Sequence, residues 1–247
     1  MVVGVSAINH GKGMLFSLVA TYSGSLSQCC TYIEKIELGN EFLGSKVSKD
    51  EQETESSLLR ANFVKKALQK AFDFYASKNG RKPRQLIVYR DAVGGPSMEA
   101  KCLRNEVDYI QASLDSFTND GNTRLLYCFV NQQLTQRFFA ASNGAIVNPG
   151  AGSVVDSHIV KSFGEEIFDF FLVPHSATVA TARPVFYSVK YNDTEITREA
   201  FETLTYHLCY NYFNFSGGIK VPNVVKYAEK AANYAADIRG KPNAHLT

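Results

Sequence analysis

The sequence lacks the features of several protein classes. No apolar run approaches the roughly 20 residues that a membrane-spanning helix needs. The first 13 residues, MVVGVSAINHGKG, have neither the basic start nor the longer apolar stretch of a signal peptide. Seven Pro and 17 Gly in 247 residues are too few for a collagen-like or low-complexity fibre. We therefore expect an intracellular protein without a membrane segment, in the cytoplasm or the nucleus.

Common cofactor and catalytic motifs are also missing. The five Cys are an odd number and contain no C-x-x-C pair, so neither a disulfide framework nor a zinc ribbon is expected. The five His show no H-x-x-x-H spacing, and no G-x-S-x-G elbow is present. The single G-K-G stretch at 11–13 is neither a P-loop nor a dinucleotide fingerprint. A net charge of +2 hides local patches and excludes no partner.

What is present predicts one folded domain over 1–247. The chain is 45% hydrophobic, with 17 Phe and 13 Tyr, which is enough for an ordinary core. The β-rich runs at 1–8, 14–22 and 28–36 predict an antiparallel meander. A polar loop is expected over 50–56 and an amphipathic helix over 57–77. Strands at 85–91 and 124–130, joined by a helix at 97–117, predict parallel pairing.

The second half of the chain completes the pattern. We expect a Gly-rich loop over 140–153, strands within 166–174 and 184–191, and helices over 198–213 and 223–238. The order resembles an RNase H-like core, an α/β fold with a mixed central sheet flanked by helices. Fold analogy alone does not give a function.

Few residues stand out for chemistry. Asp91 ends an apolar strand before a Gly-Gly turn, where a carboxylate suits Mg²⁺ or caps the turn. Asp156 follows a Gly-rich stretch, and its simplest interpretation is a structural hydrogen-bond acceptor near a turn. The simplest interpretation of Glu41 is a solvated loop residue, and that of Glu229 is a residue on a solvated helix face. Residues 60–84 hold eight basic residues and one acid, Asp73. This basic stretch is interpreted either as a solvated surface or as a patch that faces phosphates.

Six blocks together resemble the PIWI domain of Argonaute proteins, and specifically that of the Piwi branch. They are LIVYRDAV (86–93), FVNQQLTQRFF (129–139), NPGAGSVVD (148–156), FDFFLVPHSATVATARPVFYSV (168–189), LTYHLCYNYFNFSGGIKVP (204–222) and KYAEK (226–230). They follow the family's order and spacing over essentially the whole chain. The resemblance implies guide-RNA-directed recognition of a target RNA. In active members it also implies cleavage by a two-metal RNase H-like site.

The catalytic set implied by the resemblance is degenerate. The first ligand of the family falls on Ser6, where Asp is expected, and the second maps onto Glu41 in a loop. The third is intact as Asp91, and the fourth, usually His or Asp, is Glu229. Asp91 and Glu229 remain as candidate Mg²⁺ ligands. A neutral hydroxyl cannot bridge two Mg²⁺ as a carboxylate does, so we expect target slicing to be absent or severely reduced.

The resemblance also implies RNA contacts. Arg183 matches an Arg near the guide backbone, Arg137 is retained, and Lys220 and Lys226 lie where relatives face guide phosphates. Gln132 and Gln133 replace a Lys-Arg pair common in the family, and Ala92 replaces a Gly.

Three functions remain open. They are a slicer-deficient silencing module that binds guide and target RNA with silencing-complex proteins, an active endoribonuclease, and a protein-interaction scaffold. The length fits a PIWI domain alone, and we expect the N-terminal, PAZ and MID domains of the family to lie outside this chain.

Overall fold

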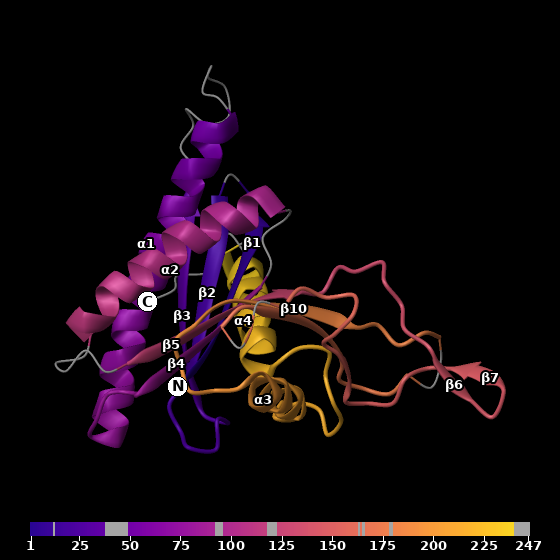
Figure 1. Cartoon of the computed structure of the whole chain (residues 1–247). Coiled ribbons are helices and arrows are strands. Elements are labelled where there is room, and N and C mark those ends of the chain that lie inside the picture. Colours follow the sequence, from indigo (N-terminus) through magenta and orange to yellow (C-terminus); the bar gives the residue numbers. More distant parts are fainter. Residues whose placement is uncertain are drawn as a thin grey trace.

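The computed structural model describes residues 1–11, 13–37, 49–91, 96–117, 123–162, 164, 166–177 and 180–239. In this part of the chain, eight strands form a mixed sheet in the order β3-β2-β1-β4-β5-β10-β9-β8, and two more form a separate hairpin (Figure 1). The strands are β1 (Val2–His10), β2 (Gly13–Thr21), β3 (Cys29–Glu37), β4 (Gln85–Asp91), β5 (Arg124–Asn131), β6 (Ala140–Ser142), β7 (Ala145–Val147), β8 (Ser153–Val155), β9 (Phe168–Val173) and β10 (Val185–Asn192).

Five neighbouring strands form the RNase H-like core that the sequence predicts. Strands β1, β2 and β3 are an antiparallel meander, as expected from the three β-rich runs. Strand β4 pairs in parallel with β1 on one side and with β5 on the other. The remaining strands β10, β9 and β8 extend the sheet by antiparallel pairing. The expected mixed sheet is therefore confirmed.

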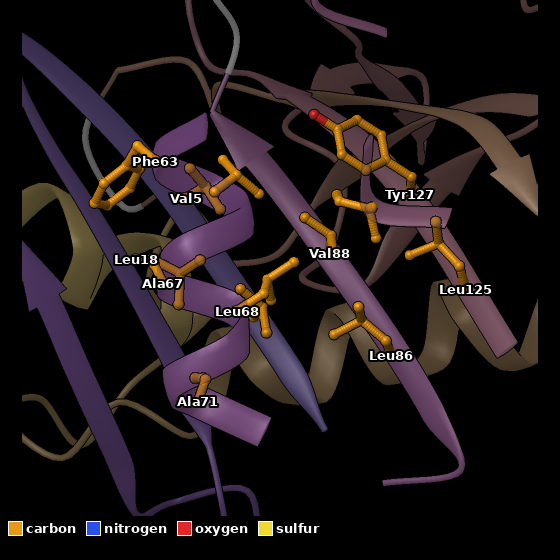
Figure 2. Packing of buried hydrophobic residues seen from close by; sticks show 14 of the residues in the cluster. Val5, Leu18, Phe63, Ala67, Leu68, Ala71, Leu86, Val88, Leu125 and Tyr127 are labelled. Carbon is orange, nitrogen blue, oxygen red and sulfur yellow. The ribbon is translucent and has the colours of Figure 1, made fainter. Parts of the chain in front are cut away.

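Helices cover both faces of this sheet (Figure 1). Helices α1 (Lys49–Asn79) and α2 (Pro96–Phe117) pack together on one face, and α3 (Arg198–Tyr210) and α4 (Asn223–Arg239) lie on the other. Alternate residues of a strand point to opposite faces, so Leu86 and Val88 join the cluster of α1 and α2, while Ile87 and Tyr89 join the cluster of α3 and α4. Figure 2 shows part of the first cluster, in which Leu68 and neighbouring side chains of α1 lie together with side chains from β1, β2, β4 and β5.

The prediction of a polar loop over 50–56 is wrong, because helix α1 already begins at Lys49. Residues 49–56, KDEQETES, are rich in Glu and Gln, which are good helix formers. Negative charge in the first turns also interacts favourably with the positive end of the helix dipole. The same acidic run therefore extends the helix.

The Gly-rich loop expected over 140–153 is also wrong in part, because it contains the β6–β7 hairpin. Asn143 and Gly144 join the two strands with φ of 52° and 77°. Positive φ at both central residues is the pattern of a type I′ turn, for which Asn-Gly is the preferred pair. The hairpin projects from the body of the sheet (Figure 1).

Helix α3 ends at Tyr210, three residues before the expected end at 213. Asn211 caps this end, because its backbone N–H donates to the carbonyl of Leu208 at 3.4 Å and its side chain donates to the carbonyls of Leu26 at 3.0 Å and Ser25 at 3.2 Å. Helix α4 agrees with the expected helix over 223–238. Among the described residues, no helix has the length and apolarity required to cross a membrane.

Candidate nucleic-acid interface

The close approach of α4 to β1 builds one wall of the candidate site. A Cβ atom on Gly4 would lie 2.4 Å from the backbone carbonyl carbon of Val224, so only glycine fits at this crossing. Ser6 lies two residues further along β1 and therefore faces the same way, toward α4. One strand over, the Ser17 hydroxyl donates to the carbonyl of Ala228 at 2.6 Å, which fixes the middle of α4 on the sheet.

A buried ion pair holds the end of β4. The Arg90 Nε lies 3.1 Å from a carboxylate oxygen of Glu106 on α2, and both side chains have no exposed surface. The Tyr127 hydroxyl donates to the same carboxylate at 2.5 Å. Arg90 also donates to the carbonyl of Asp91 at 3.0 Å. Because adjacent residues of a strand point to opposite faces, this anchor directs Asp91 toward α4.

Four elements bring a polar cluster together at this strand end. The Ser6 hydroxyl of β1 donates to Asp91 Oδ2 at 3.0 Å. Gln132, directly after β5, donates from Nε2 to Asp91 Oδ1 at 3.4 Å and also to Glu229 Oε1 on α4. Lys226 Nζ lies 2.8 Å from Glu229 Oε2, one helical turn away. The structure thus places three of the four predicted family positions side by side.

Two carboxylates close together affect each other's ionisation. Burial raises the pKa of Asp91, and the carboxylate of Glu229 raises it further. The hydrogen bonds from Ser6 and Gln132 and the charge of Arg90 oppose this rise in pKa. The direction shows that the negative charge on Asp91 is only partly compensated by the surrounding protein.

A groove of about 1010 Å³ runs along this cluster, and its lining includes Ser6, Asp91, Gln132, Arg183, Lys220 and Glu229. Lys220 Nζ donates to the backbone carbonyl of Gln132 at 2.7 Å. Burial lowers the pKa of Lys220, and the charge of Arg183 lowers it further, with smaller contributions from Arg137 and Lys226. Burial and Lys220 also lower the pKa of His175. The charges of Arg183, Arg137 and Lys226 therefore act against the charged form of Lys220, and the carboxylate of Glu229 favours it.

The other sequence-predicted residues have different positions. Glu41 and Ala92 lie outside the described residues. Asp156 follows β8, which pairs with β9 at the edge of the sheet. Gln133 is exposed and lines the groove. Within the basic stretch 60–84, Arg60 is buried over the Phe16 ring and Lys82 pairs with Asp73, while other lysines remain exposed on α1.

Two contacts in the cluster were not anticipated from the sequence. One is the double hydrogen bond of Gln132, which has no local signal because its partners lie 41 and 97 residues away. The other is the Lys226–Glu229 ion pair, whose i, i+3 spacing is visible in the sequence and is typical of helical pairs.

Without Glu41, which lies outside the described residues, the donor set of the cluster does not fit a pair of divalent cations. Among the described residues, no group of three or more His, Cys, Asp and Glu side chains gathers as a metal site does. The cluster offers two carboxylates and one neutral hydroxyl, and one carboxylate is already bound to a lysine. Two-metal sites clamp the ions with several anionic ligands.

Comparisons with known proteins agree with the fold. The family model described as Piwi domain matches residues 3–238. Piwi-like protein 1 of Danio rerio is 32% identical over 184 residues, which are 74% of this chain and 21% of that protein. The chain thus spans about a fifth of the length of that curated relative.

Solved structures share the architecture. The crystal structure of Drosophila Piwi matches 95% of this chain and 29% of its own, with a TM-score of 0.74 and 24% identity. Kluyveromyces polysporus Argonaute, solved with a guide RNA, matches 95% of this chain and 28% of its own, with a TM-score of 0.71 and 21% identity. From the meander, the strand-end cluster and the family match over residues 3–238, we conclude that this chain belongs to the Piwi domain family.

Proposed function

We propose that this chain binds a duplex of a small guide RNA and its target RNA, as a module of RNA-mediated gene silencing of the piRNA type. The observation that carries the proposal is the groove along the strand ends, with Arg183 and Lys220 in its wall and Arg137 and Lys226 nearby. Membership of the Piwi domain family supports it.

The charge arrangement suits a phosphate backbone. Burial and the charges of Arg183, Arg137 and Lys226 all disfavour the charged form of Lys220, and a phosphate bound beside Lys220 would offset this effect. A-form duplexes are recognised largely through phosphates and 2′-hydroxyls, so such a groove needs no base-specific contacts. We expect binding to depend strongly on salt and weakly on sequence.

We further propose that the chain does not slice the target. Ser6 supplies a hydroxyl where the family resemblance implies a carboxylate, and the described residues do not fit two divalent cations. In this proposal the chain works by holding the duplex, and silencing depends on other components. Silencing-complex proteins are the partners that this role requires.

A binding and cleavage assay with the 247-residue chain tests both proposals. The chain is mixed with a labelled guide–target RNA duplex in Mg²⁺, and complex and product are measured together. We expect complex without product. Absence of a complex, together with no enriched small RNA in immunopurified full-length protein, would favour the scaffold function instead.

A second candidate is an endoribonuclease that uses Asp91 and Glu229 with Glu41. The observation in its favour is that Asp91 and Glu229 both line the groove and share the Gln132 amide, and that burial and the charge of Glu229 raise the pKa of Asp91. Mg²⁺-dependent cleavage that disappears in the Asp91→Ala variant would establish this function and overturn the slicer-deficient one.

The proposed function also concerns where the protein lies in the cell and which domains accompany this chain. We infer an intracellular protein, because Cys29, Cys30, Cys128 and Cys209 are free thiols and the last two are buried. We also propose that the whole chain is one PIWI domain, and that the PAZ and MID domains belong to the longer protein. Sequencing the full-length transcript tests this.

A further inference from the structure

The side chain of Gln132 has an unusual position between two negative charges. Its Nε2 donates one hydrogen bond to Asp91 Oδ1 at 3.4 Å and another to Glu229 Oε1. An amide nitrogen has two hydrogens and accepts nothing, so each carboxylate receives one of them. The point between two carboxylates is also where a bridging cation would bind.

The remaining oxygens of the two carboxylates also have donors from the chain. Asp91 Oδ2 accepts from the Ser6 hydroxyl at 3.0 Å, and Glu229 Oε2 lies 2.8 Å from Lys226 Nζ. Each of the four carboxylate oxygens therefore has a protein donor. A divalent cation would have to displace the Gln132 amide and bind beside the positive charge of Lys226.

The backbone of Gln132 is fixed independently of its side chain. Lys220 Nζ donates to its carbonyl at 2.7 Å, and the next residue's N–H donates to Asn131 Oδ1 at 2.9 Å. These contacts hold the segment after β5 against the groove wall. Moving the side chain out of the cluster therefore requires rotation about its own bonds, with loss of both hydrogen bonds.

We propose that Gln132 closes this strand-end site to divalent cations, by occupying the position between Asp91 and Glu229 with an amide donor. Gln132 is a positioning residue that acts through the two carboxylates. The inference uses the proposed function only to locate the site, because it concerns cation binding by the chain without RNA.

Cation binding to the 247-residue chain tests the inference, with Mn²⁺ as the probe and electron paramagnetic resonance as the measurement. The native chain is expected to show no saturable site below about 1 mM, the weak end of the range for oxygen-ligand sites. Gln132→Ala removes the donor from Asp91 Oδ1 and Glu229 Oε1, and this variant is expected to bind Mn²⁺ at least about 10-fold more tightly than the native chain. Gln136→Ala is the matched control, because Gln136 is exposed and is not among the residues that line the groove, so its change should leave the native behaviour.

A second variant keeps the test decisive if Gln132→Ala fails to fold. Gln132→Glu has nearly the same shape and supplies a third carboxylate. Mg²⁺ at about 100-fold above its Kd should raise the melting temperature of this variant by about 5–10 °C, with no shift for the native chain. Saturable Mn²⁺ binding by the native chain as tight as in Gln132→Ala overturns the inference, and so does absence of binding in both variants. Neither result depends on RNA, so failure of RNA binding would count only against the proposed function.

Discussion

The charge of Lys220 offers the sharpest test of the groove as an RNA-binding surface. Lys220 lines the groove, donates to the carbonyl of Gln132, and has a pKa lowered by burial and by the neighbouring charge of Arg183. Lys220→Met removes the charge and keeps most of the apolar stem. A melting curve of the variant controls for loss of the hydrogen bond to Gln132.

The magnitude follows from counterion release. Each phosphate contact contributes roughly 0.7–0.9 to the slope of log K against log salt, so four cations predict a slope of about −3 to −3.5. Raising KCl fourfold, from about 50 to 200 mM, should then weaken duplex binding by about 50–150-fold. In Lys220→Met, with one contact fewer, the same change should weaken binding by only about 20–40-fold.

Fluorescence anisotropy with a labelled RNA duplex at several KCl concentrations measures these slopes. Lys65→Met is the matched control, because Lys65 is an exposed lysine on α1. Its slope should equal that of the native chain. An unchanged slope in Lys220→Met, with a reduced slope in Lys65→Met, would refute the groove and assign RNA binding to the basic face of α1.

Three further predictions concern the scaffold of the site. Gly4→Ala should destabilise the fold by about 3 kcal/mol because its Cβ would lie 2.4 Å from the backbone of α4, whereas Gly24→Ala, with nothing within 4 Å, should change the unfolding free energy by less than about 0.5 kcal/mol. Equal effects in urea denaturation would contradict this close packing. Glu106→Leu breaks a fully buried ion pair and should lower the unfolding free energy by about 3–5 kcal/mol. Asp73→Asn, at an exposed pair, should lower it by under about 1 kcal/mol. Similar melting temperatures of the two variants would refute this contrast. Asp91→Asn should stabilise the chain at pH 7, because burial and the charge of Glu229 raise the pKa of this carboxyl above its unfolded value and its charged form therefore opposes folding. The gain should disappear as the pH falls through the raised pKa of Asp91 toward about 3.9, and a gain that grows on acidification in urea titrations would contradict it.

The core could be predicted from the sequence because its signals are local. The strand 85–91 alternates between two buried faces, and its boundaries agree with β4. Asp91 could be placed at the strand end for the same reason. The Asn143-Gly144 pair is an equally local turn signal, and its interpretation as part of a Gly-rich loop overlooked the short strands on either side.

The assembly of the site could not be predicted from local pattern. The exposed-face interpretation of Glu229 was reasonable for a helix rich in Ala and Lys, but α4 turns this carboxylate toward the groove. The reason is the crossing at Gly4, whose missing Cβ lets the helix backbone approach the strand. A glycine in an apolar strand does not indicate which distant element packs against it. Only the family resemblance linked the position of Ser6 on β1 to that of Glu229 on α4.

The crossing of β1 and α4 also fixes when the groove forms during synthesis. Ser17 and Ala228 are 211 residues apart, and Ser6 and Asp91 are 85 apart. A chain emerging from the ribosome makes β1 long before α4, so the sheet face around Gly4 stays exposed until α4 has been synthesised. Contacts of such long sequence separation form slowly. Chaperones that bind exposed apolar surface are therefore expected to bind the chain before α4 has folded.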